Sequence, residues 1–415
     1  MTSKNAPATA SGRVAPQLRR ARLGVFVLFM TNGMVLANLA PRFPEIRVEL
    51  GLSYGQFGLA LLFSGFGALA LGLTAAASIR RFTSARVGVV AMCFMAIAAL
   101  FVVLAPNGYI FAALLFTMGA VDSLVDVAQN THGLRVQREY KRNIINAFHG
   151  MWSVGAVIGG LMGGLAAGLE IPLNVHMAVV AVIIIAINVV GYRWLLPGAD
   201  SAPEPITDTP TRRGFPRVPR GVWLALLALS TIAIAGAWVE DAAISWSASY
   251  FKDELTTGAT VASLGFVALM LMHFVGRMIG DRLIDRFGQR LVIRVGGFIT
   301  AIGMGAALLW PSVPLTIVGF GLAGLGVATT IPVAMHMADE LPGFRAGTGL
   351  TIVSWSLRVG FMASPVIVGA VADATSLRVG LTFVVVAGLG IAALASVMKG
   401  KEVAPARGTE SPANT

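Results

Sequence analysis

The sequence predicts an all-α polytopic membrane protein, with twelve transmembrane helices arranged as two six-helix bundles. Three observations predict this class. The 415 residues are 56% hydrophobic and only 12% charged, whereas soluble chains average about 25% charged residues. The apolar residues fall into twelve long runs. The basic residues gather in the short segments between alternate runs, as they do in the cytoplasmic loops of membrane proteins.

Twelve apolar runs are the expected transmembrane helices. They cover residues 22–41, 54–79, 86–105, 108–134, 144–168, 173–196, 221–250, 259–280, 290–310, 314–338, 346–372 and 376–398. A helix needs about 20 apolar residues to cross the hydrocarbon core of a bilayer. Between runs, Pro106-Asn107, Ile171-Pro172 and Leu341-Pro342 interrupt the apolar pattern, and such pairs are typical of turns. The elements are therefore expected to be helices joined by short loops.

Basic residues set the expected orientation. If both termini lie in the cytoplasm, 26 of the 31 Lys and Arg residues fall on that side and four on the other. Cytoplasmic loops carry such an excess, and adding or removing one helix would destroy it. We therefore expect a multi-pass protein of the inner (plasma) membrane with both termini in the cytoplasm. The net charge of +11 then reflects topology, and no nucleic-acid partner is expected.

A proline-rich segment divides the runs into two sets of six. The expected organisation is a disordered cytoplasmic N-terminus at 1–20, a six-helix bundle at 21–196, a cytoplasmic linker at 197–220, a second six-helix bundle at 221–398 and a disordered cytoplasmic C-terminus at 399–415. The halves echo each other, since Arg80-Arg81-Phe82 ends the second run much as Asp285-Arg286-Phe287 ends the eighth. Internal duplication is typical of transporters, whose substrate sites lie between the repeats near the middle of the bilayer.

The stretch Gly276–Arg290 joins the eighth and ninth runs and holds four arginines and two aspartates. Each ionised group costs about 2.5–3.5 kcal/mol or more at the bilayer centre, so the stretch is expected to be a turn at the cytoplasmic surface. It is either an ordinary basic loop or a cytoplasmic gate, in which Asp281 or Asp285 pairs with arginines of the turn or caps a neighbouring helix. The expected gate residues are Gly276, Gly280, Asp281, Arg282, Asp285, Arg286, Gly288 and Arg290.

The same turn carries a family resemblance. A Gly, an Asp about a turn later and then Arg-x-Gly-x-Arg form the loop signature of the major facilitator superfamily, which Gly280 and the segment Asp285–Arg290 resemble with one extra residue. Asp126–Asn130 and Asn146–Trp152 are similar to the branch of fucose-permease-like and rhizopine-transport-like carriers. The resemblance covers roughly residues 20–400. It implies two bundles that rock about a central cavity lined by helices one, four, seven and ten, with contributions from helices five, eight and eleven.

Two carboxylates inside the fourth run are candidates for proton transfer, because lipid makes intramembrane charges costly. Asp122 and Asp126 are four residues apart and so share one helix face, which Gln129 and Asn130 continue. Two close carboxylates repel, so one of them is expected to hold a proton near neutral pH. Alternatively, both brace neighbouring helices through hydrogen bonds. The resemblance implies that a carboxylate of helix four takes part in proton coupling, without saying which.

Arg358 lies near the centre of the eleventh run, where an arginine needs a partner. The candidate partners are Asp122, Asp126, Glu240 and Asp241, or an anionic group of a substrate. A pair between the two halves could act as a switch that breaks and re-forms as access alternates. A pair within one half would brace the structure instead.

The other residues expected along the pathway are Asn32, Gln129, Asn130, His149, Trp246, Glu240 and Asp241. Asn32 could bind a substrate hydroxyl or a backbone carbonyl. His149 could titrate near physiological pH or form a structural hydrogen bond. Trp246 could stack on a sugar or belong to the aromatic belt at the membrane interface. The acidic pair of the seventh run is expected outside the midplane, in its outer half.

No motif indicates an enzyme, a metal site or a cofactor. The sequence lacks the Walker A and HExxH patterns, and His273 is expected near a cytoplasmic helix end without a role. The expected partners are the lipid bilayer, protons and a small-molecule substrate, for a monomer. The expected function is proton-coupled transport of a small polar solute, sugar-like or cyclitol-like. The alternatives are proton-driven efflux of hydrophobic drugs and a membrane sensor or scaffold that transports nothing.

Overall fold

The computed structural model describes residues 16–142, 144–200, 218–344 and 347–398. Within these ranges every regular element is a helix, and twelve helical segments are long and apolar enough to cross a membrane. The all-helical class and the predicted number of spans are confirmed. Most of the expected disordered termini and of the expected linker lies outside the described ranges. The first helix begins at Pro16, so its start extends into the stretch expected to be disordered.

The first half of the chain contains six of the twelve spans. Its helices are α1 (Pro16–Leu39), η1 (Ala40–Arg42), α2 (Phe43–Glu49), α3 (Tyr54–Gly72), α4 (Ala75–Phe82), α5 (Ser84–Val102), α6 (Gly108–Tyr140), α7 (Ile145–Gly168) and α8 (Leu173–Tyr192). Side chains define several of the helix starts. The Ser53 hydroxyl accepts a hydrogen bond from the Gln56 backbone N–H at the start of α3, and Asn107 caps α6 in the same way. Such caps satisfy backbone donors that have no partner within the helix.

The second half contains the other six spans. Its helices are α9 (Arg220–Ser249), η2 (Tyr250–Glu254), α10 (Ala259–Ala262), α11 (Leu264–Phe287), α12 (Gln289–Leu309), α13 (Val313–Val327), α14 (Thr330–Asp339), α15 (Thr348–Ala374), α16 (Leu377–Gly380), α17 (Thr382–Leu394) and η3 (Ala395–Val397). Gly288 separates α11 from α12 with a φ of +82°, a conformation that glycine adopts without the strain a side chain would bring. The charged turn Gly276–Arg290 is therefore mostly helical.

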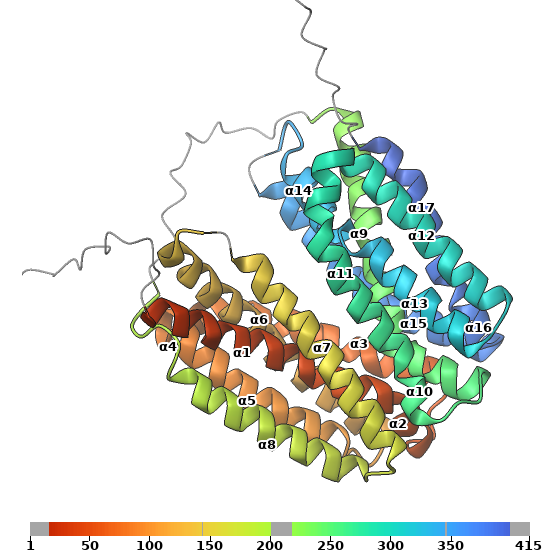
Figure 1. Ribbon diagram of the computed structural model, residues 1–415, viewed down its shortest axis with the longest axis horizontal. Helices are drawn as coiled ribbons and strands as arrows, with labels where there is room; N and C mark the ends of the chain where they lie inside the picture. Colours follow the sequence, from red (N-terminus) through yellow and green to blue (C-terminus); the bar gives the residue numbers. More distant parts are fainter. Residues whose placement is uncertain (1–15, 143, 201–217, 345–346, 399–415) are drawn as a thin grey trace, which may run out of the picture.

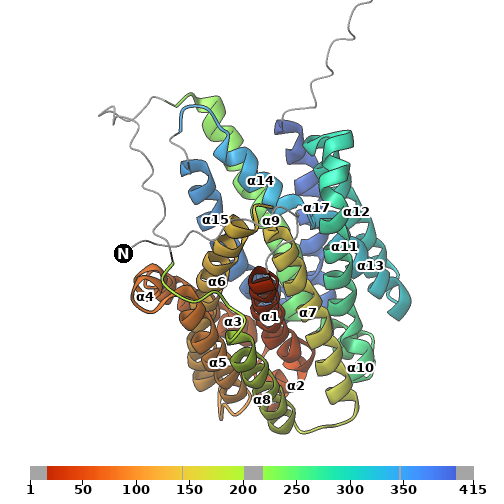
Figure 2. The ribbon, with the colours of Figure 1, turned by 60° about the vertical axis from the view of Figure 1, so that its left-hand side comes forward.

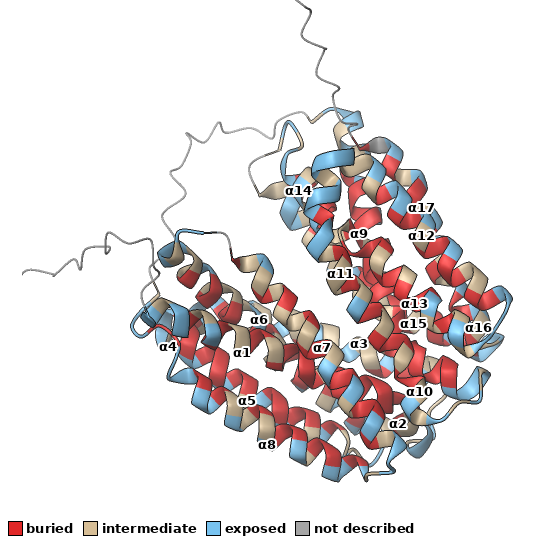
Figure 3. Cartoon of the chain, in the orientation of Figure 1, coloured by how far each residue is buried: buried red, intermediate tan, exposed pale blue. Residues whose placement is uncertain are grey.

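Figure 1 shows the halves as two inclined bundles, which meet near α2 and α10 and diverge toward α4 and α14. The view in Figure 2 shows the same arrangement. Buried residues lie on the helix faces that point into each bundle, while exposed residues lie on the outer faces (Figure 3). Many of the exposed residues are large and apolar, including Val90, Phe94 and Ile302. Contiguous exposed apolar surface of this kind indicates contact with a membrane.

Small residues let α1 and α7 pack backbone against backbone. A methyl group on Gly33 would overlap the carbonyl oxygen of Trp152, and one on Gly155 would overlap the carbonyl oxygen of Met30. Small residues promote close packing of this kind between helices in membranes. As a result, Asn32 of α1 lies within hydrogen-bond distance of the Trp152 indole.

Polar contacts join the halves at the end where they meet. We call this group the seal; its residues are Arg47, Ser53, Tyr54, Gly55, Asp253 and Asp373. Asp253 accepts hydrogen bonds from the Arg47 guanidinium at 3.0 Å and from the Tyr54 hydroxyl at 2.7 Å. Asp373 accepts hydrogen bonds from the Ser53 hydroxyl and from the Tyr54 backbone N–H. The seal holds the start of α3 in the first half against η2 and the end of α15 in the second.

Candidate functional site

A cavity of about 320 Å³ with five polar residues in a mostly apolar lining lies between the halves. It is formed by residues of α1, α3, α6, α9 and α15 together with Phe43 at the start of α2. Its polar lining residues are Ser64 and Asp122 from the first half and Asp241, Ser245 and Arg358 from the second. The rest of the lining is apolar or glycine. The cavity therefore brings charged groups that lie up to 236 residues apart in the sequence (122 to 358) into one space.

Asp122 is fixed by a chain of hydrogen bonds through Asn32. The Trp152 indole N–H can only donate, and it lies 2.9 Å from the Asn32 side-chain oxygen. The Asn32 amide nitrogen therefore faces Asp122, to which it donates a hydrogen bond of 2.7 Å. Three helices, α1, α6 and α7, thus set the position of one carboxylate at the cavity wall. The partners of Asn32 are thus side chains and not the backbone carbonyl that was one of its two expected partners; the other, a substrate hydroxyl, stays a prediction.

Arg358 enters the same cavity from α15. Its guanidinium attracts the Asp122 carboxylate electrostatically, yet among the described residues it makes no direct ion pair. A cation and a carboxylate on opposite walls can be bridged by a polar solute or brought together by movement of the halves. The structure places Arg358 in one cavity with two of its four expected partners, Asp122 and Asp241, without deciding between these alternatives.

Asp241 lines the same cavity as Asp122. It belongs to the span Arg220–Glu254, and its expected place in the outer half of that span stays a prediction. Its Oδ1 accepts a hydrogen bond from Ser245 at 3.1 Å. Its Oδ2 is buried and has no hydrogen-bond partner among the described residues. The second half therefore contributes both a carboxylate and a cation to the cavity.

Glu240 points away from this cavity and toward α11. Its Oε1 lies 3.9 Å from Nδ1 of His273, and both side chains are buried. Arg277, one turn further along α11, attracts the Glu240 carboxylate. The prediction that His273 lies near a helix end was wrong, because α11 continues to Phe287 and His273 lies near the middle of that helix. Sequence reasoning missed His273 and Arg277; their spacing of four residues on one helix was the available signal.

Asp126 differs from Asp122 in its surroundings. It is exposed and accepts a hydrogen bond of 3.0 Å from Asn130 on its own helix, while the buried Gln129 lies 3.5 Å away. It does not line the cavity. His149 lies edge-on to Phe29, with ring centroids 5.1 Å apart. It also interacts electrostatically with Arg277 and Asp126. These residues therefore lie outside the cavity that contains Asp122.

Trp246 lies next to the seal and not in the cavity. It is fully buried, and its ring centroid is 6.0 Å from that of Tyr54 and 6.1 Å from that of Phe57, both on α3. It therefore packs between the halves in this conformation, where neither a sugar nor lipid headgroups reach it.

The expected gate residues occupy the end of α11 and the start of α12. Gly276 and Gly280 pack closely on α13 and the residues after it, since a methyl group on either would collide with Ala328 or Thr329. The Arg286 guanidinium lies 5.3 Å from the Phe287 ring centroid, and Arg81 and Phe82 repeat this geometry in the first half at 5.2 Å. The remaining members, Asp281, Arg282, Asp285, Gly288 and Arg290, lie in the same turn. Their role as a gate stays a prediction.

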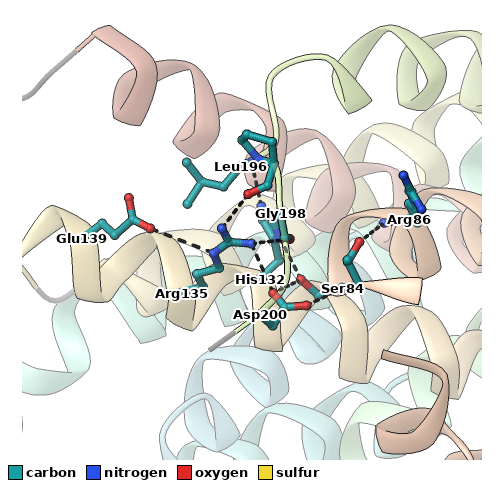
Figure 4. Close-up of polar contacts among 10 residues, drawn as sticks. Ser84, Arg86, His132, Arg135, Glu139, Leu196, Gly198 and Asp200 are labelled. Carbon is teal, nitrogen blue, oxygen red and sulfur yellow. Dashed lines mark hydrogen bonds and ion pairs between the residues drawn. The ribbon is translucent and has the colours of Figure 1, made fainter. Parts of the chain in front are cut away.

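A Ser–His–Asp cluster ties the start of the linker to the first half (Figure 4). Asp200 accepts hydrogen bonds from the backbone N–H and the hydroxyl of Ser84, both at 2.6 Å. The Leu196 N–H donates to Nε2 of His132 at 3.1 Å, so Nδ1 carries the proton in the neutral ring and faces the Ser84 oxygen at 2.8 Å. Because the Ser84 hydroxyl proton points to Asp200 and not to His132, the cluster is structural and not a nucleophilic triad.

The sequence matches the Major Facilitator Superfamily over residues 25–255 and 231–414. Among similar proteins, the uncharacterized transporter y4wD of Sinorhizobium fredii is 30% identical over 91% of this chain and 97% of its own length. Membrane protein MosC of Rhizobium meliloti is 29% identical over 89% of this chain and 88% of its own.

Solved structures share the fold at low sequence identity. A bacterial homologue of the human lysosomal transporter Spinster, in an inward-facing and occupied conformation, superposes with a TM-score of 0.72 at 15% identity, over 93% of this chain and 97% of that one. A D-xylose–proton symporter gives a TM-score of 0.69 at 13% identity, over 92% and 97%.

Proposed function

We propose a function for this chain, which belongs to the Major Facilitator Superfamily. It is a proton-coupled secondary transporter of a small polar organic solute, sugar-like or cyclitol-like. It would act in the inner (plasma) membrane with both termini in the cytoplasm. The halves would rock about the central cavity, so that the seal and the charged turn close opposite ends in alternation.

The observation that carries this proposal is that Asp122 and Arg358, from opposite halves, line one cavity. Intramembrane charges are costly and are typical of substrate and proton pathways. When Asp122 is ionised, its attraction to Arg358 favours approach of the halves. A proton on Asp122 removes that attraction and frees Arg358 for an oxygen of the solute. Proton binding and solute binding are coupled through this one pair.

The other cavity residues supply the groups that a polyol or sugar requires. Asn32 orients Asp122. The Ser64 and Ser245 hydroxyls can donate hydrogen bonds to hydroxyl groups or accept them, and the Asp241 carboxylate can accept them. The volume of about 320 Å³ is at the small end of the range of about 300–1,000 Å³ typical of ligand pockets. It therefore favours a solute with one ring over a large hydrophobic drug. The solved D-xylose–proton symporter of the same fold is consistent with this choice.

The experiment is uptake by the purified protein in liposomes, with sugars, sugar acids, cyclitols and cationic dyes as candidate solutes. Accumulation of a polar solute that increases with an imposed pH gradient supports the proposal. Accumulation of the dyes alone would instead support efflux of hydrophobic drugs. If none of the candidates is taken up while the protein stays folded, the proposed substrate class is wrong.

A further inference from the structure

A second hollow of about 340 Å³ lies between α11, α12 and α13, outside the central cavity. Its floor contains Gly276, Gly280, Gly296 and Gly326. Its rim is formed by apolar side chains that are between 37% and 48% exposed: Ile279, Leu283, Phe287, Leu291 and Val295. We call this hollow the groove. Its partly exposed apolar rim indicates that it opens toward lipid.

Glycine packing explains why the groove exists. Gly280 of α11 lies against Thr329 just before α14, and Gly296 of α12 lies against the Gly326 carbonyl of α13. α11 and α12 are joined by the short connection at Gly288, but each packs separately on the helix behind them. The space between them is left open along the two rows of apolar rim residues. An elongated apolar molecule fits this shape.

Positive charge gathers at the end of the groove nearest the turn. Four arginines lie at or beside this end: Arg282, Arg286, Arg290 and Arg294. The same stretch has only two carboxylates, those of Asp281 and Asp285. The Arg286 guanidinium lies 5.3 Å from the ring centroid of Phe287, which is itself a wall of the groove. The excess of cations places the headgroup of an occupant here, with its apolar part in the groove. Basic pockets between transmembrane helices on the cytoplasmic side are typical binding sites for anionic headgroups.

We propose that the groove binds one acyl chain of an anionic phospholipid, whose phosphate contacts Arg286 and its neighbouring arginines. This rests on the orientation in the proposed function, which places the turn at the cytoplasmic surface. The lipid would bind along α11, the helix that also carries His273 and Arg277. It thereby gives the charged turn a ligand of its own, separate from the transported solute.

The test measures lipid retention by native mass spectrometry of the purified protein, mixed with phosphatidylglycerol or phosphatidylcholine of equal chain length. One phosphatidylglycerol per protein is expected to be retained in preference to phosphatidylcholine. Filling the groove with Leu283→Trp and Val295→Trp should abolish retention of this phosphatidylglycerol. The matched control is Val90→Trp and Phe94→Trp, which adds two indoles to exposed positions on α5. If the double groove variant does not fold, Ile279→Phe is the smaller substitution at the same rim.

Charge is tested with Arg286→Gln, which should lower the preference for phosphatidylglycerol by about fivefold. Its matched control is Arg81→Gln, because Arg81 makes the same contact with Phe82 in the first half. Retention of phosphatidylglycerol by the filled groove would overturn the proposal, as would equal losses from the two arginine variants. Lipid retention is measured without transport, so this result is independent of whether the proposed transport function is correct.

Discussion

Replacing Asp373 by Ala is expected to open the end of the protein where the halves now meet. Its carboxylate accepts hydrogen bonds from the Ser53 hydroxyl at 2.6 Å and from the backbone N–H groups of Tyr54 and Gly55 at 2.8 and 2.9 Å. These N–H groups are at the start of α3, where helices leave donors without partners. The donors and the acceptor belong to different halves, so the contacts must break when this end opens.

The size of the effect follows from the same contacts. A carboxylate at a helix start stabilises it by about 0.3–1 kcal/mol, and a capping side chain by about 0.5–2 kcal/mol. Because the contacts are partly exposed, we expect Asp373→Ala to destabilise the closed state relative to the open state by about 1–2 kcal/mol in total. This corresponds to a factor of about 5–30 in the ratio of closed to open protein. The helix itself should survive, since Ser53 still accepts a hydrogen bond from the Gln56 N–H.

The assay is double electron–electron resonance between spin labels on Val48→Cys and Gly258→Cys, in a background with Cys93→Ser. Val48 is exposed, and a side chain at Gly258 would have open space around it. Asp373→Ala should add a population with a longer distance. Glu49→Ala, which removes an exposed carboxylate at the same end, is the control and should keep the original distribution. Identical distributions for Asp373→Ala and the unchanged protein would refute the reasoning about the seal.

Two further predictions concern the cavity and the linker. Asn32→Ala should raise substrate affinity by up to about tenfold, because ionised Asp122 loses a charge-assisted hydrogen bond of roughly 1.5 kcal/mol and the protonated form that frees Arg358 is favoured; binding calorimetry measures this, and unchanged affinity would remove Asn32 from the site. Asp200→Ala should destabilise the first half by about 1–3 kcal/mol, because Ser84 loses both of its bonds to that carboxylate; thermal unfolding should show a lower midpoint than for Glu139→Ala, and equal midpoints would contradict the anchoring role.

Hydropathy and charge were enough to predict the fold class. The twelve spans follow from the length of the apolar runs, because each run must cross the bilayer independently of its neighbours. The same physics selected Asp122 and Arg358, since charges within spans are rare and costly. Both residues line the cavity between the halves. Properties that depend on one helix at a time could therefore be predicted from the sequence.

Properties that depend on how two helices are aligned could not be predicted from the sequence. The presence of Asp241 in one cavity with Asp122 and Arg358 depends on the alignment of α9 with α6 and α15, which apolar runs do not specify. The approach of His273 to Glu240 depends on the alignment of α9 with α11. Trp246 is buried because the halves meet around it in this conformation. None of these alignments has a local sequence signal.

The central claim is that Asp122 couples solute movement to protons, and one measurement tests it most directly. In liposomes, uptake driven by a pH gradient is compared with exchange of labelled for unlabelled solute at equal pH, which requires no net proton movement. Asp122→Asn should abolish gradient-driven uptake and retain exchange, while Asp126→Asn should retain both. Uptake by Asp122→Asn that still rises with the pH gradient would contradict the claim.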